Sequence, residues 1–344
     1  MRSLLLFALA ASIGLSSPAS SQMRSLGVPN DKGWQHAQTG IILMPKLGAF
    51  QRAKLSDNGS SEFDISATYY GPDQVDTVSI YIYRPGIANL PMWFDRSHYA
   101  MTVNPQIKVG APLGPIVHFA PPGSTIESGL RVAYALKDGD KGGTGLAMVP
   151  FGDWLLAVRL SSPTMTATEV DASLLDIVGK VRWPSLRPAE QVAVPVLPCA
   201  NALKTRKAKL IQPDLAQALI GATLSNLAEK KASEQAAQTT RPATFCREGA
   251  ATLEYGMYRS DVATDGYVLA LGDAGLSASV FPGLSLSNRK EYAVTLATHD
   301  SRDTYPSFNA LPEPKQVFAL VTSRGAMSRA MRGGNNIIVA PTDK

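Results

Sequence analysis

Hydrophobic and polar positions alternate with two different periods along this chain, and together they predict a mixture of strands and helices. Apolar residues recur at every second position in 63–69 and again in 78–82, which is the period of a half-buried strand. Gly71-Pro72-Asp73 separates these stretches and is typical of a turn, so they predict a β-hairpin. The same alternation predicts further strands at 132–136, 146–150 and 153–160.

The helical period appears twice in the first half of the chain. Thr166 and Glu169 have the spacing of a capping box, and one apolar stripe follows, made of Val170, Leu174, Ile177, Val178 and Val181. This pattern predicts a helix that ends at Trp183-Pro184. A shorter helix is predicted over 89–103, with Pro91 in its first turn.

Prolines at 184, 188, 195 and 198 resist both helix and central strand. They predict a stiff linker over 185–198 between a domain at 34–184 and a second domain at 199–340.

In the second domain we expect a helix and several strands, followed by a short basic helix. The expected helix covers 214–237, the strands lie near 253–257, 267–271, 276–281, 292–297 and 317–321, and the short helix covers 324–332. Gly272-Asp273-Ala274-Gly275 predicts a hairpin turn. The expected fold class is α+β, with two domains that each contain an antiparallel sheet packed with helices.

The first residues have the order of a secretory signal peptide. Arg2 precedes an apolar run over 4–15, and small residues follow up to Ser21. The run is shorter than the roughly 20 residues that a membrane-spanning helix needs. We expect cleavage after Ser21, with cleavage after Ala19 or an uncleaved N-terminal anchor as alternatives. The signal peptide, residues 1–21, predicts a periplasmic or secreted protein without a transmembrane segment in its mature chain.

Composition is that of a globular protein and argues against a nucleic-acid partner. Apolar residues make up 45% of the 344 residues and charged residues 18%, and the formal net charge is +5. The one tight basic cluster, Lys204, Arg206, Lys207 and Lys209, lacks interleaved aromatic residues. We interpret this cluster as a solvated approach to a helix. Weak contact with anionic lipid or cell-wall polymer is the alternative.

Cys199 and Cys246 are the only cysteines in the sequence. An isolated pair in an exported chain predicts one disulfide, and two free thiols are the alternative. The bridge would close a loop of about 50 residues, for which the chain-entropy model gives about 4 kcal/mol of stabilisation. The spacing is unlike Cys-x-x-Cys, which argues against a redox role of the thioredoxin type.

No sequence motif assigns a catalytic, cofactor-binding or metal-binding residue. The four histidines are His36, His98, His118 and His299, and none has a partner at the spacing of a zinc motif. The Gly-x-Ser-x-Gly elbow is absent. The glycine run at 142–145 opens a predicted strand, whereas a phosphate loop opens a helix. We therefore expect no cofactor.

Part of the first domain resembles a known group of exported proteins. The residues that carry the resemblance are Gly152-Asp153-Trp154-Leu155-Leu156-Ala157-Val158-Arg159-Leu160, the capped helix, Arg182-Trp183-Pro184, the Thr39-Gly40-Ile41 strand and the hairpin near Tyr69 and Tyr81. In the order of these elements, residues 34–184 resemble the PsbP-like and DcrB-like exported proteins. The resemblance implies an antiparallel sheet sandwiched by helices and an accessory, assembly or envelope-associated role without chemistry. It carries no functional residues.

Three classes of function remain open at this point. The leading hypothesis is a non-enzymatic accessory or binding protein of the cell envelope, which binds an envelope protein or cell-wall component through a sheet face or the inter-domain groove. The first alternative is an envelope hydrolase with a dispersed site, in which His98 or His118 acts as general base. The second is a small-ligand carrier that uses the aromatic residues Trp93, Phe94, Tyr99, Tyr81 and Tyr83.

Overall fold

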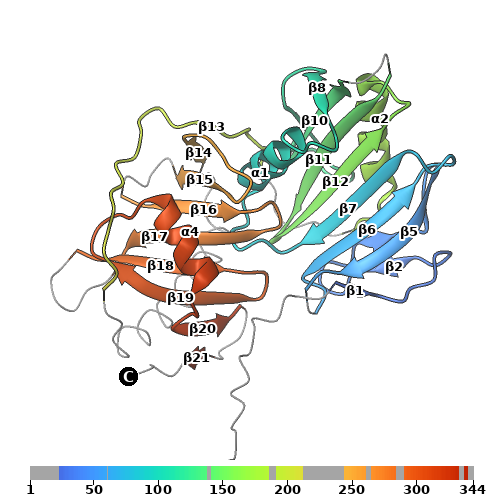
Figure 1. Ribbon diagram of the computed structural model, residues 1–344. Coiled ribbons are helices and arrows are strands. Elements are labelled where there is room, and N and C mark those ends of the chain that lie inside the picture. Colours follow the sequence, from blue (N-terminus) through green and yellow to red (C-terminus); the bar gives the residue numbers. More distant parts are fainter. Residues whose placement is uncertain are drawn as a thin grey trace, which may run out of the picture.

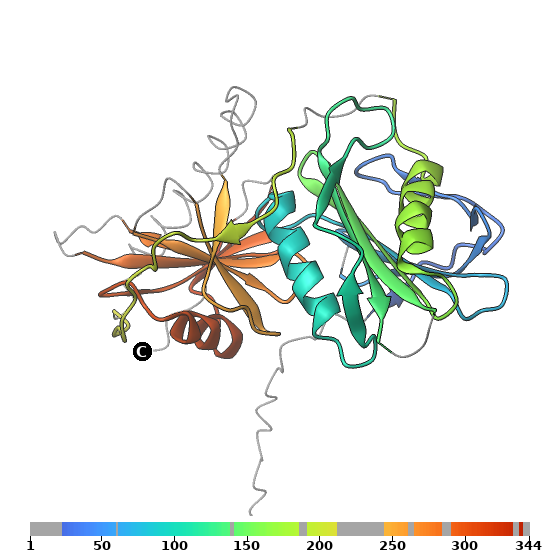
Figure 2. The ribbon, with the colours of Figure 1, turned by 90° about the horizontal axis from the view of Figure 1, so that it is seen from above.

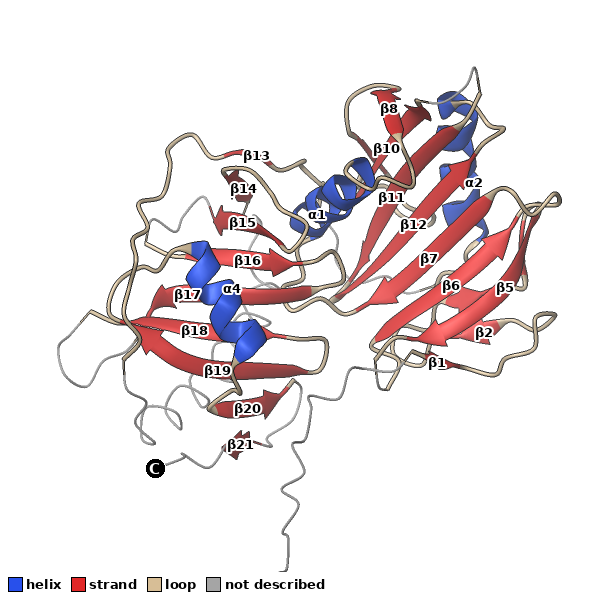
Figure 3. Ribbon diagram, viewed as in Figure 1, coloured by secondary structure: helices blue, strands red, loops and turns tan. Residues whose placement is uncertain are grey.

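Two large, mainly antiparallel sheets and three helices make up the described part of the protein, which is mostly β and suggests two domains (Figure 1 and Figure 3). The computed structural model describes residues 23–59, 61–137, 141–185, 191–211, 244–260, 265–283, 290–332 and 337–339. The expected signal peptide at 1–21 and the expected helix at 214–237 lie outside the described residues.

The first sheet, called sheet 1, has ten strands in the order β1-β5-β6-β7-β12-β11-β10-β8, with β4 paired to β5 and β9 to β10. A separate pair is formed by β2 and β3. The bounds are β1 (Arg24–Ser25), β2 (Trp34–Gln35), β3 (Ile42–Leu43), β4 (Lys46–Leu47), β5 (Phe50–Asp57), β6 (Asp64–Tyr70), β7 (Thr77–Tyr83), β8 (Val109–Pro112), β9 (Val117–Phe119), β10 (Gly129–Leu136), β11 (Gly143–Phe151) and β12 (Trp154–Ser162).

The second sheet, called sheet 2, has nine strands that follow chain order from β13 to β21. Only β13 and β14 run parallel within it. The bounds are β13 (Leu197–Pro198), β14 (Phe245–Glu248), β15 (Tyr255–Ser260), β16 (Tyr267–Leu271), β17 (Leu276–Pro282), β18 (Tyr292–Ala297), β19 (Ser301–Phe308), β20 (Ser328–Met331) and β21 (Ile337–Val339).

The hairpin and both helices predicted in the first half are confirmed. Strands β6 and β7 pair antiparallel, with Ala67 opposite Ile80. Helix α2 (Ala167–Lys180) begins with the predicted capping box between Thr166 and Glu169. Helix α1 (Leu90–Thr102) begins at Asn89, whose side chain accepts a hydrogen bond from the Met92 N–H.

Two predictions near the C-terminal end are wrong. Residues 317–321, expected as a strand, lie in helix α4 (Pro314–Ser323), and residues 324–332, expected as a helix, contain strand β20. A short apolar run cannot distinguish a strand from a helix by itself. The feature that identifies the helix is its start, where Pro314 lies in the first turn and Gln316 accepts from the Glu313 N–H at 3.4 Å.

Helices α1 and α2 pack on opposite faces of sheet 1. In Figure 2, α2 lies on the side of sheet 1 away from sheet 2, whereas α1 lies between the two sheets. Helix α1 contacts β10 and β11 of sheet 1 and also β15 and β16 of sheet 2. The hydrophobic core around α1 includes Tyr258, Val268 and Ala270 of sheet 2. One core therefore continues across the contact between the sheets, which we call the seam.

Two buried charged residues of α1 join it to sheet 2. Arg96 is 0% exposed and donates to the carbonyl oxygens of Gly272 at 2.8 Å, Thr252 at 3.0 Å and Leu253 at 3.2 Å. Its neighbour Asp95 accepts from the Arg247 guanidinium at 2.6 Å and from the Tyr258 hydroxyl at 2.7 Å. A buried charge is tolerated when it is paired or hydrogen-bonded in this way.

The predicted turn at 272–275 connects β16 to β17 and reaches sheet 1. Leu271 lies opposite Leu276, which confirms the hairpin. Gly275 has a φ of 95°, which glycine adopts without strain, and its carbonyl accepts from the Gly86 N–H at 2.7 Å. A Cβ on Gly275 would lie 2.9 Å from the Tyr83 ring. The turn therefore fits against sheet 1 because it carries no side chain at that position.

The segment between α2 and sheet 2 is attached at both ends. The Ala193 N–H donates to the Glu127 carbonyl at 2.9 Å, which holds the segment to the first domain. Strand β13 then pairs with β14, and Cys199 forms a disulfide with Cys246, the pairing expected from the sequence.

We expect Gly86→Ala to destabilise the protein because the seam has no room for a side chain there. A Cβ at Gly86 would lie 2.6 Å from the Ala297 carbonyl oxygen and 2.7 Å from the Ala297 Cβ. Overpacking of this kind should lower the free energy of unfolding by about 2 kcal/mol. Urea denaturation measures this difference. The control is Gly179→Ala in α2, where nothing lies within 4 Å and alanine favours the helix. Equal stability of the two variants would contradict this packing.

Asp95→Asn should lower the free energy of unfolding by about 3 kcal/mol, since removing one partner of a buried ion pair leaves the other uncompensated. The control is Asp153→Asn, because Asp153 is 61% exposed and pairs with Arg84 at 3.3 Å. An exposed pair contributes less than about 1 kcal/mol. If chemical denaturation shows the same loss for both variants, Asp95 does not hold the seam.

Candidate functional site at the seam

One face of sheet 1 divides into an apolar half and a hydroxyl-bearing half. Leu146, Met148 and Leu155 lie in the core beneath α1. Across β6, β7 and β12 the same face presents polar side chains, because directly opposed residues of antiparallel strands share a face. Thr68 lies opposite Ser79, which lies opposite Arg159. We call the uncharged polar half the hydroxyl face; its members are Ser66, Thr68, Tyr70, Thr77, Ser79, Tyr81 and Ser161.

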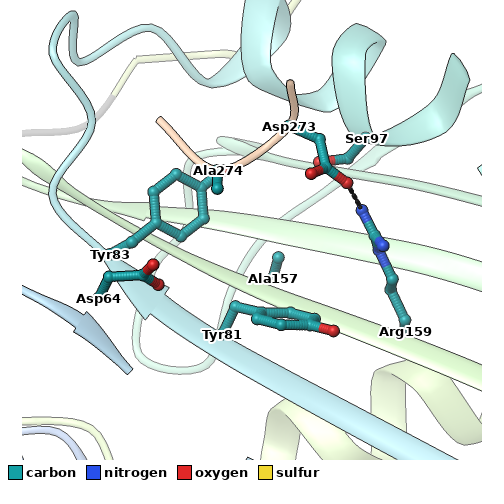
Figure 4. A pocket seen from close by; sticks show the side chains of 8 residues that line it. All are labelled: Asp64, Tyr81, Tyr83, Ser97, Ala157, Arg159, Asp273 and Ala274. Carbon is teal, nitrogen blue, oxygen red and sulfur yellow. Dashed lines mark hydrogen bonds and ion pairs between the residues drawn. The ribbon is translucent and has the colours of Figure 1, made fainter. Parts of the chain in front are cut away.

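A small cavity of about 80 Å³ lies where the two halves meet. Asp273 and Ala274 of the turn and Ser97 of α1 approach it from one side, and side chains of sheet 1 form the other (Figure 4). The sheet residues that line it are Asp64, Tyr81, Tyr83, Ala157 and Arg159. The cavity is therefore built from both sides of the seam.

An ion pair across the seam closes one side of the cavity. Arg159 of β12 donates from Nη2 to Asp273 Oδ2 at 2.5 Å, as the dashed line in Figure 4 marks. The guanidinium carbon also lies 5.5 Å from the centroid of the Tyr81 ring, within the range of a cation–π interaction. These contacts hold the Arg159 and Tyr81 side chains in fixed positions.

Asp64 and His299 form a second contact across the seam. His299 Nε2 lies 3.9 Å from Asp64 Oδ2, and His299 Nδ1 lies 3.0 Å from the Arg84 carbonyl oxygen. Because a carbonyl only accepts, the Nδ1 atom carries a proton in this arrangement. Burial raises the pKa of the Asp64 carboxyl above its ordinary value, and the charge of His299 opposes this effect.

Two buried polar atoms of the lining residues have no hydrogen-bond partner among the described residues, the Tyr83 hydroxyl and Arg159 Nε. Burial also raises the pKa of the Tyr83 phenol, so this hydroxyl stays protonated. Buried polar atoms in proteins are nearly always paired with protein, water or ligand. A cavity of this size has room for water or for one small polar group, but is well below the roughly 300 Å³ of a drug-sized pocket.

The histidines proposed as general bases do not line the cavity. His98 Nε2 lies 2.6 Å from the Tyr134 hydroxyl, and burial lowers the pKa of its imidazole. His118 pairs with Glu127 at 2.9 Å on the surface. His36 is buried and bonds through both ring nitrogens, to Thr39 and to the Glu62 carbonyl.

The five aromatic residues of the carrier hypothesis are divided between two environments. Tyr81 and Tyr83 line the cavity, whereas Trp93 and Phe94 are buried in the core around α1. Tyr99 belongs to neither group; its ring centroid lies 5.6 Å from the guanidinium carbon of Arg96.

A second, open depression of about 490 Å³ lies between residues 208–210 and α4. Gln316, which lines it, already uses both amide atoms on the Ala208 backbone, at 2.8 and 2.9 Å. The basic cluster beside this depression is exposed; its members are Lys204, Arg206, Lys207 and Lys209. The helix that it was expected to approach lies outside the described residues. The cavity at the seam is the stronger candidate because it alone of the two is lined by residues with unpaired buried atoms.

Comparisons with family models, curated proteins and solved structures found no match to this chain. Within the described ranges, no three His, Cys, Asp or Glu residues lie close enough to hold a metal ion. In the same part of the chain, no helix combines the length and apolar character needed to span a bilayer. Fold and site together define a mostly β protein of two sheets with a polar cavity at their seam.

Asp64→Asn should change the pH dependence of stability. Because the folded pKa is raised above 3.8, the contribution of Asp64 to stability is fully present below pH 3.8 and is lost as the pH rises through the folded pKa. The asparagine side chain does not ionise, so the variant does not lose this contribution. Its free energy of unfolding relative to wild type should therefore increase between about pH 4 and about pH 7. Urea denaturation across this range measures the difference.

His299→Gln provides the matched test of the same pair. His299 lowers the pKa of Asp64, so its removal should make the decline of stability with rising pH larger than in wild type. The free energy of unfolding of Asp64→Asn, relative to wild type, could instead stay constant or fall as the pH rises. That result would show that burial is not the main influence on the pKa of Asp64.

Proposed function

We propose that this protein is an exported, non-enzymatic binding protein of the cell envelope and that the hydroxyl face of sheet 1 is its binding surface. The observation that carries the proposal is the combination of a half-exposed polar sheet face with two side chains fixed at its border, Tyr81 and Arg159. Tyrosine and arginine dominate binding energy at many interfaces, and side chains that are already ordered lose less entropy on binding.

The sequence and the fold support the cellular part of the proposal. The residue order of 1–21 favours export. A disulfide between Cys199 and Cys246 suits an oxidising compartment such as the periplasm or the cell exterior. Helices α1 and α2 cover opposite faces of sheet 1, an arrangement that supports a PsbP-like sandwich for 34–184. Helix α4 packs on sheet 2, which supports an α+β classification of both domains.

The chemistry of the hydroxyl face favours binding over catalysis at that surface. Serine, threonine and tyrosine hydroxyls both donate and accept hydrogen bonds. Thr144 Oγ1 lies 2.8 Å from Ser161 Oγ at one border, so part of this network is already formed. Strands hold such groups at regular positions, which provides a rigid array for a polar partner.

Cosedimentation with an insoluble bacterial cell-envelope preparation tests the proposal. The wild-type protein should sediment with the preparation, and Ser79→Arg should reduce the bound fraction at least about fivefold, since it places a bulky charge at the centre of the face. The control is Leu175→Arg, because Leu175 is exposed on α2, which covers the opposite face. Circular dichroism verifies that both variants are folded.

Loss of sedimentation only in Ser79→Arg supports the assignment of the hydroxyl face. Failure of the wild-type protein to sediment at low and moderate salt, or equal losses in both variants, would reject it.

A further inference from the structure

We propose that the open depression between residues 208–210 and α4 binds an anionic phospholipid and so brings sheet 2 into contact with a membrane surface. This site is separate from the hydroxyl face and goes beyond the proposed function. The observation behind it is that the depression combines an apolar floor with positive charges that have no ion-pair partner among the described residues.

The floor of the depression is apolar. Phe308 of β19 and Leu320 of α4 line it and are mostly buried, whereas Leu210 is half-buried and Ala319 is exposed. Apolar side chains that line an open depression remain in contact with water, so covering them with hydrocarbon is favourable. The floor therefore suits a ligand that carries an apolar part.

The charged side chains at the depression are all positive. Lys209 and Arg324 line it and are exposed, and no described residue of the lining carries a carboxylate. Neither cation forms an ion pair within the described ranges. An anion can therefore approach both cations without displacing a protein carboxylate.

Further cations extend this positive region. The segment before the depression contributes three exposed side chains and the first turn of α4 one more, namely Lys204, Arg206, Lys207 and Lys315. The segment is held beside the start of α4, because the Arg206 N–H donates to the Leu311 carbonyl at 3.1 Å. Glu313 at the helix start is one opposing charge in this region. Clusters of about four to eight cations are typical of segments that bind anionic lipid headgroups.

The two uncharged polar side chains of the depression already have protein partners. Both atoms of the Gln316 amide bond to the Ala208 backbone. The Ser323 hydroxyl donates to the Ala319 carbonyl. A bound peptide needs hydrogen-bond partners for its own backbone, whereas hydrocarbon needs none. Free cations above an apolar floor therefore match a phosphate joined to hydrocarbon, and membrane binding of this kind combines apolar burial with electrostatic attraction.

Cosedimentation of the full chain with lipid vesicles tests the inference. The wild-type protein should bind phosphatidylcholine vesicles that contain about 30% phosphatidylglycerol and should not bind vesicles of phosphatidylcholine alone. Lys209→Glu/Arg324→Glu should weaken this binding at least about tenfold, because anions replace both cations. The control is Lys46→Glu/Lys137→Glu, which changes the net charge equally at two exposed lysines, one in β4 and one directly after β10. It should weaken binding less than about twofold, since distant charges are screened by salt.

Ala319→Gln tests the apolar floor separately. Its side chain adds uncharged bulk at the depression and should weaken vesicle binding at least about threefold, because hydrocarbon no longer covers the floor. Ala172→Gln is the matched control, since Ala172 is also exposed on a helix, α2, and should bind as wild type does. Glutamine is nearly as good a helix former as alanine, so both variants should stay folded, as circular dichroism verifies.

Three results would overturn the inference. They are absence of binding to the phosphatidylglycerol vesicles, equal losses in the two charge variants, and unchanged binding of Ala319→Gln. Inorganic phosphate that releases the protein better than sodium chloride of equal ionic strength would also overturn it, because the cations would then form a site for free phosphate.

Ser79→Arg separates this site from the hydroxyl face. It should bind the phosphatidylglycerol vesicles at least as well as wild type does, because the depression lies beside sheet 2. Failure of the vesicle test therefore leaves the proposed function intact, and failure of the envelope test leaves the lipid site intact.

Discussion

The burial of the Arg96 guanidinium is the constraint on which the rest of this structure depends. Burial lowers the pKa of the side chain, but a guanidinium stays charged in proteins, so it must find acceptors. It finds them in three carbonyls of the connections between strands of sheet 2, those of Thr252, Leu253 and Gly272, the last of which starts the turn. The position of α1 therefore determines the position of the turn, and the turn brings Asp273 to Arg159.

The cavity at the seam is a consequence of joining two sheets through polar groups. Apolar surfaces can adjust to each other by repacking, whereas ion pairs and carbonyl contacts require particular distances and directions. Where the turn covers the end of the polar half of sheet 1, these requirements leave the Tyr83 hydroxyl without a hydrogen-bond partner among the described residues. Stability alone would favour replacing such a group, so its presence directs attention to binding.

Local patterns predicted the elements of the first domain well and those near the C-terminal end less well. The capping box at Thr166 and the alternation through Ile65 and Ile82 are strong because each needs only neighbouring residues. The five apolar residues in α4 fit the period of a strand as well as that of a helix, and only the helix start at Pro314 distinguishes the two. Strands β5 and β19 were not predicted, since charged and polar residues interrupt their alternation.

By itself, the sequence determined the hairpin of β6 and β7, the helices α1 and α2, the turn at 272–275 and the isolated cysteine pair. These features depend on side-chain periods, caps and turn residues that act within a few positions. Only the tertiary structure decided that Arg159 meets Asp273, 114 residues away, and that Asp64 meets His299. Such contacts depend on strand order and on how one sheet packs against another, and no local pattern of residues records either.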